Sequence, residues 1–221
     1  MITNNYLNGH NLYPTYWATY NTFAYGFDIT IFSRVEIAYV CTLIDSKRKD
    51  NPDEIDKIRV NQDRHFSAKI QVLREGEFVP WMPALAVGVC DPISATLVGY
   101  RYVINEDIGG SGMFNRVYIV ATKHFDTKAG PIGIHVGYQY NRRYYLNYNG
   151  PACAIDWKPV WISHMNSNVI SDVDLIAEYD GRTFDIGCIV SFWKSHFELM
   201  LQFNALRYFE AGLRYKFVLK S

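Results

Sequence analysis

Apolar and polar residues alternate along the C-terminal part of the chain, from Val173 to Lys220. In the last segment, one set of alternate positions is occupied by Phe209, Ala211, Leu213, Tyr215, Phe217 and Leu219. The positions between them are occupied by Glu210, Gly212, Arg214 and Lys216. Because successive side chains of a strand point to opposite sides, this pattern predicts a strand with one apolar and one charged face. The preceding segments repeat the pattern, so the region predicts four strands joined by short turns.

The two-residue period continues through the rest of the chain, and no stretch shows the 3.6-residue period of an amphipathic helix. Eight further strands are predicted, at residues 12–20, 22–32, 34–45, 63–75, 79–90, 113–125, 130–141 and 154–164. The fold class is therefore all-β, with about twelve strands. Neither a domain linker nor a low-complexity tract interrupts the pattern, so residues 1–221 are predicted to form a single domain.

The connections between these segments alternate in length for most of the chain. Short connections are predicted at residue 33 and at residues 75–78, 126–129, 165–170 and 194–195. Long connections are predicted at residues 46–62, 91–111 and 142–153, whereas those at 180–182 and 205–206 are short. Outer-membrane barrels have short periplasmic turns, longer external loops and an even strand number. The sequence therefore predicts a closed antiparallel transmembrane β-barrel of about twelve strands, with ten or fourteen as alternatives.

A soluble β-sandwich is the alternative fold, because its strands would show the same alternation with the charged face in water. Aromatic content favours the barrel: it reaches 16%, with 17 tyrosines, and Tyr and Trp prefer surfaces where an apolar medium meets water. Hydrocarbon also offers no partner for backbone N–H and C=O groups, so a sheet in a membrane must have no free edge. We therefore expect a barrel whose apolar faces point outward into lipid.

Composition excludes several other classes of protein. Apolar residues make up 49% of the chain, but no run approaches the roughly 18 apolar residues that a membrane helix needs. Basic and acidic residues number 22 each, and this balance argues against nucleic acid as a main partner. The first five residues lack the basic start and apolar run of a signal peptide. If the protein is exported, we expect the numbering to describe a mature or shortened chain.

Several motifs that can indicate ligand binding have simpler interpretations here. The four cysteines, at positions 41, 90, 153 and 188, are too far apart for a metal knuckle and are predicted to be small apolar wall residues. The charged run from Lys47 to Asp50 is predicted to be a solvated loop. The glycine cluster from Gly109 to Gly112 lacks the strand-to-helix context of a phosphate-binding loop, so a flexible loop is favoured.

The six histidines have no spacing that would bring metal ligands together locally. His65 and His135 fall on the polar faces, and a membrane-embedded hydrolase would need such a histidine with a Ser or carboxylate partner, for which Glu178 and Asp174 are candidates. Polar-face charges of both signs occur at Asp28, Glu36, Lys69, Arg116, Asp174, Glu178, Glu198, Glu210, Arg214 and Lys216. Ion pairs filling a narrow lumen explain these charges more simply. We therefore predict no catalytic, cofactor-binding or metal-binding residues and no cofactor.

Three groups of motifs resemble the YjbH family of bacterial outer-membrane proteins. The first comprises Asn61 to Lys69, Leu73 to Gly76 and Pro83 to Gly88; the second comprises Asp107 to Phe114 and Tyr118 to Lys123; the third comprises Leu175 to Gly181 and Gly212 to Tyr215. They occur in the same order and with similar spacing, over roughly residues 30–217. The chain departs from the family pattern in two ways. Residues 92–106 interrupt the usual passage to the glycine block, and the chain is much shorter than the longer family members.

The resemblance implies a barrel in the bacterial outer membrane that is linked to exopolysaccharide or capsule production. On that basis we expect a non-enzymatic envelope component whose partners are outer-membrane lipid and other envelope or polysaccharide-export proteins. The alternatives are a lipid- or glycan-modifying barrel enzyme and an accessory subunit of another outer-membrane complex. Residues 92–106 imply an enlarged external loop. Because the chain is shorter than the longer family members, we expect one barrel without their additional domains.

Overall fold

The structure is a computed structural model of the chain, and it describes residues 22–47, 58–92, 95–98, 101–103, 116–140, 149–163 and 169–217. The first group of strands comprises β1 (Thr22–Ile31), β2 (Val35–Lys47), β3 (Ile58–Leu73), β4 (Ala84–Cys90), β5 (Ala95–Val98) and β6 (Arg101–Val103). The second comprises β7 (Arg116–Phe125), β8 (Ile132–Tyr140), β9 (Gly150–Trp157), β10 (Ile170–Tyr179), β11 (Phe184–Phe192), β12 (Phe197–Asn204) and β13 (Tyr208–Tyr215). A single turn of helix, α1 (Val160–Ser163), lies between β9 and β10.

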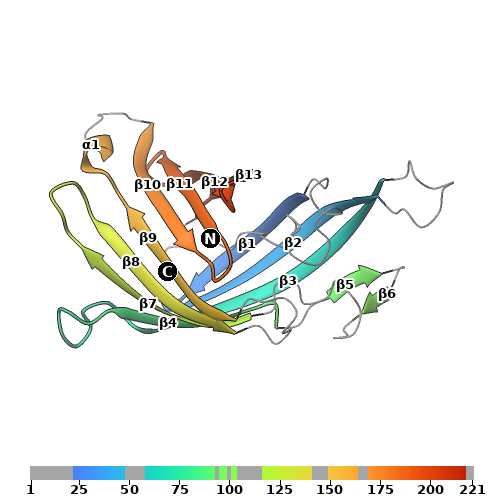
Figure 1. Cartoon of the computed structure of the whole chain (residues 1–221), viewed down its shortest axis with the longest axis horizontal. Helices are drawn as coiled ribbons and strands as arrows, with labels where there is room; N and C mark the ends of the chain where they lie inside the picture. Colours follow the sequence, from blue (N-terminus) through green and yellow to red (C-terminus); the bar gives the residue numbers. More distant parts are fainter. Residues whose placement is uncertain are drawn as a thin grey trace. The chain divides into compact units, whose positions relative to one another are not determined.

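The strands form an antiparallel meander, in which each strand of the main path pairs with its neighbours in sequence. The hydrogen-bonded order is β1-β2-β3-β4-β7-β8-β9-β10-β11-β12-β13, and β5 pairs with β3 and β6 away from this path. Figure 1 shows β1 beside β2 and β10 beside β11, as the ladders Ile29↔Ile37 and Leu175↔Cys188 require. The predicted all-β antiparallel fold is confirmed.

Eleven strands lie on the main path of the described residues, where the sequence predicted about twelve. The predicted strand at residues 12–20 lies outside the described residues. The predicted long connection at 91–111 contains β5 and β6, which the sequence analysis did not anticipate. β5 pairs with β3 and β6, and both strands lie off the main path. The remaining strands follow one another as a simple meander.

Two of the predicted long connections are shorter in the structure, because the flanking strands extend into them. The connection predicted at residues 46–62 is shorter, because the β2–β3 ladder extends to Lys47↔Ile58. Backbone hydrogen bonds hold a ladder, so polar side chains can continue it beyond the apolar segment. Likewise, β9 begins at Gly150, inside the long connection predicted at 142–153.

Two other predicted strands are longer than the strands that the structure shows. Prolines shorten the first at its start, and a helical turn follows the end of the second. The strand predicted at 79–90 begins only at Ala84, and residues 79–83 belong to a loop containing Pro80 and Pro83. Proline has no N–H to donate to a ladder, so it ends or excludes strand pairing. The strand predicted at 154–164 ends at Trp157 and is followed by α1. None of the helices in the described ranges is long and apolar enough to cross a membrane.

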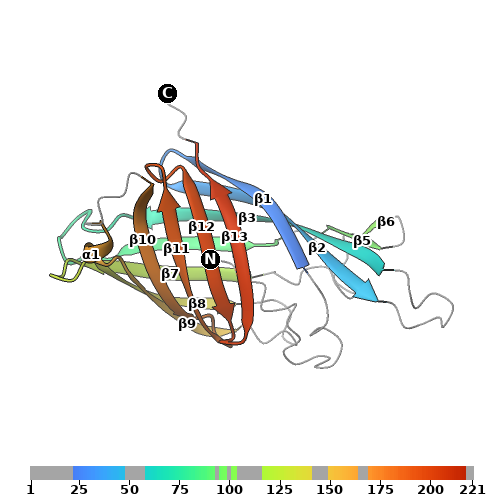
Figure 2. The same ribbon diagram turned by 90° about the horizontal axis from the view of Figure 1, so that it is seen from above.

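The chain divides into two compact units. Unit 1 comprises Met1–Val72, Ala86–Ile119 and Tyr140–Asn147, and unit 2 comprises Leu73–Leu85, Val120–Gln139 and Tyr148–Ser221. Unit 1 contains the β1–β2–β3 ladder, with β5 and β6. Unit 2 contains β9 to β13 and most of β8, and Figure 2 shows β10, β11, β12 and β13 next to one another in this order.

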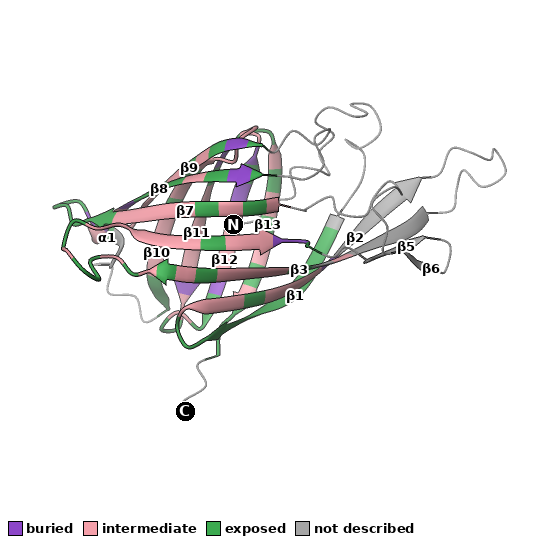
Figure 3. Cartoon of the chain, turned by 90° about the horizontal axis from the view of Figure 1, so that it is seen from below, coloured by how far each residue is buried: buried purple, intermediate pink, exposed green. Residues whose placement is uncertain are grey.

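Side-chain burial in unit 2 is the reverse of that in a water-soluble sheet. Exposed and less exposed positions alternate along its strands, as in β13, where every second residue from Phe209 to Tyr215 is exposed (Figure 3). The exposed side chains are apolar and include Ile134, Val136, Ile186, Phe203, Phe209 and Leu213. The buried side chains of the same strands are polar: Gln139, Asp185, Ser191, Glu198, Gln202 and Asn204. The faces predicted from the alternation are confirmed, and the polar face is the buried one.

Candidate functional site on the polar face

Three neighbouring strands of unit 2 bring a hydroxyl, an imidazole and a carboxylate together on the polar face. Thr122 lies on β7, His135 on β8 and Asp156 on β9. In the β8–β9 ladder, Asp156 is the register partner of Gly133, and His135 is the partner of Ala154. A Cβ on Gly133 would approach Asp156 Oδ1 to 2.1 Å. The missing side chain of Gly133 therefore allows the Asp156 carboxylate to lie across β8 toward His135.

The hydrogen bonds within this group connect the three side chains in series. His135 Nε2 lies 2.6 Å from Asp156 Oδ1, and His135 Nδ1 lies 2.9 Å from Thr122 Oγ1. A carboxylate only accepts hydrogen bonds, so in the neutral imidazole the proton resides on Nε2. Nδ1 is then an acceptor, and the Thr122 hydroxyl donates to it. A hydroxyl polarised in this way has the hydrogen bonding of an activated nucleophile.

A second histidine adjoins the group at the end of β7. The His124 ring stands edge-on to the His135 ring, with centroids 6.1 Å apart. Glu75, in the β3–β4 connection, lies 2.7 Å from His124 Nδ1 and 2.9 Å from Lys123 Nζ. The hydrogen bond from His124, assisted by Lys123, lowers the pKa of Glu75 to about 2. Glu75 is therefore a carboxylate at neutral pH, and it ties the β3–β4 connection to β7.

On the other side, a lysine joins the end of β9 to the start of β10. Lys158 Nζ lies 3.3 Å from Asp172 Oδ2 and 4.0 Å from Asp174 Oδ2. Burial disfavours the charged form of Lys158, but the two carboxylates outweigh it and raise the pKa of Lys158. The polar face at this end of unit 2 thus carries alternating acidic and basic groups from the β3–β4 connection to β10.

Opposite charges also pair elsewhere on the polar faces. In unit 1, Lys69 Nζ lies 2.7 Å from Glu36 Oε2. In unit 2, the Glu198 carboxylate is 4% exposed and pairs with Lys216 and with Arg214, whose Nε donates to Glu198 Oε2 at 2.7 Å. The predicted pairing of charges of both signs is confirmed for these five residues.

A neutral and acidic cluster occupies the opposite end of β11, β12 and β13. Gln202 Nε2 donates to Asp185 Oδ2 at 3.3 Å, and the backbone N–H of Ala205 donates to Asp185 Oδ1 at 2.7 Å. Asn204 Nδ2 donates to Glu210 Oε1 at 3.2 Å. The side-chain oxygens of Gln202 and Asn204 are buried and have no partner among the described residues. The cluster fixes the β12–β13 turn to β11.

The candidate residues of the sequence analysis are only partly brought together. His135 contacts Asp156, not the Glu178 or Asp174 considered for it, because the β8–β9 register places Asp156 opposite Gly133 and diagonal to His135. The side chain of His65, the glycine cluster at 109–112 and most of the three predicted long connections lie outside the described residues. Thr122 and Asp156 were not anticipated. The alternation in the sequence places both residues on the polar faces of their strands. It does not show the strand pairing that brings them to His135.

The described residues contain no group of three or more His, Cys, Asp or Glu side chains placed to hold a metal ion. All four cysteines are free, with Cys41 and Cys90 buried and Cys153 exposed. The described part of the polar face supports ion pairing, hydrogen bonding and, at Thr122–His135–Asp156, base-assisted attack by a hydroxyl.

Comparison with known proteins adds a family assignment. No curated protein and no solved structure matches the chain. A protein-family model does match, over residues 11–210, and that model describes an exopolysaccharide biosynthesis protein. The match covers most of the chain and parts of both units, and it includes Thr122, His135 and Asp156, whereas Arg214 and Lys216 lie beyond it. The chain therefore belongs to the YjbH family, described as exopolysaccharide biosynthesis protein YbjH.

Proposed function

We propose that this protein is a closed transmembrane β-barrel of the bacterial outer membrane, and that it assists exopolysaccharide or capsule production or export without catalysing a reaction. The observation that carries the proposal is the inverted burial of unit 2. Leu213 is 81% exposed, whereas Glu198 on the paired strand is 4% exposed. In water this arrangement would expose apolar surface and bury charge, both at a cost in free energy. In a bilayer the same arrangement is favourable.

The β12–β13 hairpin carries a pair of aromatic residues at each of its two ends. Phe197 and Tyr215 are register partners at one end, with ring centroids 4.6 Å apart, and Phe203 and Phe209 are partners at the other, 5.5 Å apart. At about 3.3 Å per residue, the six steps along the strand from Phe197 to Phe203 span about 20 Å. The apolar band of outer-membrane barrels, between its two aromatic girdles, is about 25 Å tall. The distance between the two pairs is shorter than this band, and a strand tilt of about 35–45° shortens it further along the membrane normal, so the apolar band would extend beyond the pairs.

Closure follows from the membrane environment. In hydrocarbon, an unpaired backbone N–H or C=O costs several kcal/mol, so the strands at the two ends of the hydrogen-bonded order need partners. About twelve strands, counting the predicted strand at 12–20, would give the even number typical of this class. The paired charges of Glu36, Lys69, Glu198, Arg214 and Lys216 would then line and partly fill the lumen.

A non-enzymatic role is supported by the pairing of these charged side chains with one another. Paired side chains of both signs stabilise a wall and leave no single-sign lining for a selective pore. Recognition would then fall to the connections and to lateral partners such as other envelope or polysaccharide-export proteins, because loops on a rigid scaffold usually carry binding.

The membrane assignment is tested by refolding the purified full chain. We expect monodisperse protein only in detergent or vesicles, with strand content that resists proteolysis after insertion into vesicles. A monodisperse, folded protein in buffer without detergent would overturn the assignment. Circular dichroism and size-exclusion chromatography in parallel with and without detergent distinguish the two outcomes.

A second candidate function is favoured by one observation, the hydrogen-bond series Thr122–His135–Asp156. In a lipid- or glycan-modifying barrel, the Thr122 hydroxyl would attack an ester carbonyl while His135 takes its proton. The proton would pass to the leaving alcohol, and water would release the acyl group from Thr122. Thr122→Val and His135→Gln separate the alternatives. Our proposal predicts unchanged envelope-lipid and acetyl-glycan profiles for both variants, whereas a profile changed in both and restored by Thr122→Ser would show an enzyme.

A further inference from the structure

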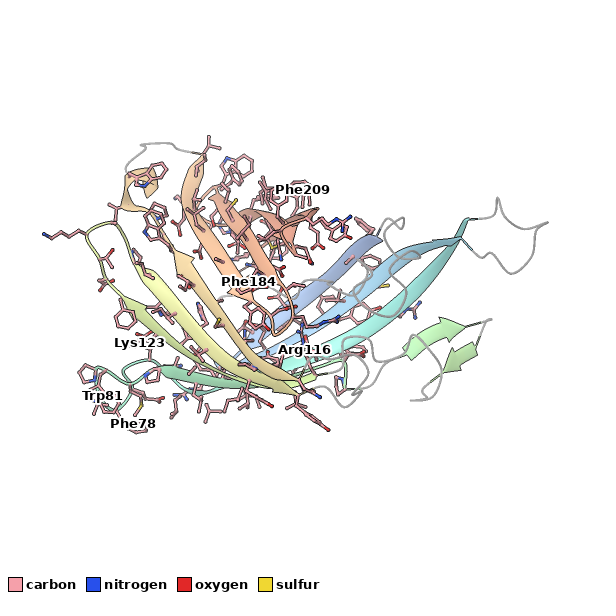
Figure 4. All side chains as sticks on the ribbon, in the orientation of Figure 1. Phe78, Trp81, Arg116, Lys123, Phe184 and Phe209 are labelled. Atoms are coloured by element: carbon pink, nitrogen blue, oxygen red, sulfur yellow. The ribbon has the colours of Figure 1, made fainter. Side chains whose placement is uncertain are left out.

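The β3–β4 connection of unit 2, residues 74–83, presents two aromatic rings at its tip. Phe78 is 71% exposed and Trp81 is 75% exposed. Both belong to an uninterrupted apolar run from Phe78 to Pro83, and Figure 4 shows their side chains pointing away from the strands. Turns between strands are normally rich in polar residues and glycine. An apolar turn tip is therefore a feature that needs a physical explanation.

The connection is ordered by its own hydrogen bonds. The backbone N–H of Gly76 donates to the carbonyl of Met82 at 3.0 Å, and that of Met82 donates to Val79 at 2.9 Å. The backbone N–H of Arg74 donates to Glu77 Oε2 at 2.8 Å. These bonds hold the tip in one conformation with both rings displayed, so their exposure does not come from a loosely packed chain.

Lys123 fastens the connection to the neighbouring strand β7. Its Nζ donates to the carbonyl oxygen of Pro80 at 2.9 Å and lies 2.9 Å from Glu75 Oε1. Glu75 is also bound by His124. Lys123 and Glu75 thus form an ion pair at the base of the connection. The apolar run from Phe78 to Pro83 projects beyond this pair.

Exposed aromatic rings recur at the same end of the unit 2 strands. In an antiparallel meander, the β3–β4, β9–β10 and β11–β12 connections lie at one common end. The β9–β10 connection displays Trp161 and the β11–β12 connection displays Trp193, both exposed. A protein partner would contact one contiguous patch, whereas a bilayer surface meets every connection along the end. Trp and Phe are also the residues that settle at the boundary between headgroups and acyl chains.

From this arrangement we propose that residues 76–82 form an interfacial anchor, with Phe78 and Trp81 inserted into the headgroup–acyl boundary of the leaflet at this end of the barrel. The occupant of the apolar tip is therefore lipid. The inference rests on the proposed membrane location and adds to it a specific contact, held in place by Lys123. A protein partner or a second copy of the chain is the competing occupant, which the experiment must separate from lipid.

The test measures the depth of Trp81 in vesicles of phosphatidylcholine and phosphatidylglycerol. The full chain, with its other four tryptophans changed to Phe, is refolded into vesicles containing lipids brominated near the headgroup or near the bilayer centre. Interfacial residues lie about 5–10 Å into the headgroup–acyl boundary, so we expect about twofold stronger quenching by the shallow label than by the deep one. Iodide in the aqueous phase should quench weakly.

A difference measurement keeps the test valid if the variant with a single tryptophan does not fold. Wild-type fluorescence minus that of Trp81→Phe isolates Trp81 while the other tryptophans stay in place. Strong iodide quenching and no lipid quenching of an inserted, protease-resistant barrel would overturn the anchor and leave the membrane location standing. Failure of the wild-type chain to enter vesicles would overturn both.

A matched pair of lysine variants tests whether Lys123 holds the β3–β4 connection in place. Lys123→Met should broaden the depth distribution of Trp81 and increase its iodide quenching, because the Pro80 and Glu75 contacts are lost. Lys128→Met, in the β7–β8 turn, removes the same charge without touching the β3–β4 connection and should leave Trp81 quenching unchanged. Equal effects of the two substitutions would contradict the assigned role of Lys123.

Discussion

At the scale of single residues, neighbours in sequence have opposite environments in this protein. Leu213 is 81% exposed, and the next residue, Arg214, binds a glutamate that is 4% exposed. The contrast follows from the alternation of side chains along a strand. In the proposed membrane location, substitutions at adjacent positions would therefore act through different surroundings, one through lipid and the other through the polar interior.

Leu213→Arg places a charge on the face that we assign to lipid. We expect it to lower the free energy of unfolding by about 2–4 kcal/mol if the position lies near the bilayer midplane, and by less near the rim. Leu213→Ile is the matched control and should have little effect. Arg214→Leu should instead act in the polar interior, because it removes one of the two cations, Arg214 and Lys216, that pair with Glu198. Urea titrations in lipid vesicles measure both, and equal tolerance of Leu213→Arg and Arg214→Leu would contradict the assigned faces.

At Gly88 of β4, a single added carbon atom is expected to destabilise the fold. A Cβ there would lie 2.3 Å from Cζ of Tyr118, whose ring covers the glycine. We expect Gly88→Ala to destabilise the fold by about 1–3 kcal/mol, because the Tyr118 ring must move. Gly212→Ala is the control, since its nearest neighbour is the flexible end of Met200 at 3.1 Å. Thermal unfolding of both variants provides the measurement, and an undiminished transition temperature for Gly88→Ala would refute the packing argument.

At the scale of elements, side chains of β7 hold the β3–β4 connection through contacts between residues far apart in sequence. The pattern of alternation predicted the strands correctly in kind, but not the β3–β4 connection, where Pro80 and Pro83 prevent pairing before Ala84. Nor did it predict that Lys123 and His124 of β7 bind this connection through Glu75. Those contacts join residues 48 and 49 positions apart, so no local pattern could reveal them.

The Glu75 contacts predict a pH dependence of stability. Hydrogen bonding from His124 lowers the pKa of Glu75 from 4.5 to about 2. A carboxylate with a lowered pKa stabilises the folded state above its unfolded pKa, and this contribution is lost as pH falls from about 4.5 toward 2. Because Glu75 is partly exposed, solvent screening limits the contribution to about 1 kcal/mol. Glu75→Gln should remove this part of the acid sensitivity of the unfolding midpoint, and an unchanged pH profile would show that the contact contributes nothing.

At the scale of the whole molecule, the proposed barrel is a scaffold with a filled interior. In the proposed barrel, paired charges would occupy the space that an open pore needs, so we expect no large, steady conductance from the purified protein in planar bilayers. The diameter of a barrel grows roughly linearly with strand number, so about twelve strands enclose only a moderate lumen. Large conductance that is blocked by added polysaccharide would instead identify a conduit and overturn the scaffold proposal.

The sequence by itself determined the all-β class, the two faces of each strand and the family, because these depend on local periodicity and on ordered motifs. Only the tertiary structure decided which polar residues meet. Asp156 reaches His135 because the β8–β9 register places it opposite Gly133, and Thr122 joins them from β7. The side-chain period of a strand is a property of its own backbone, whereas register is a property of two strands. For that reason the polar face was foreseeable, and its hydrogen-bond series and the fastened β3–β4 connection were not.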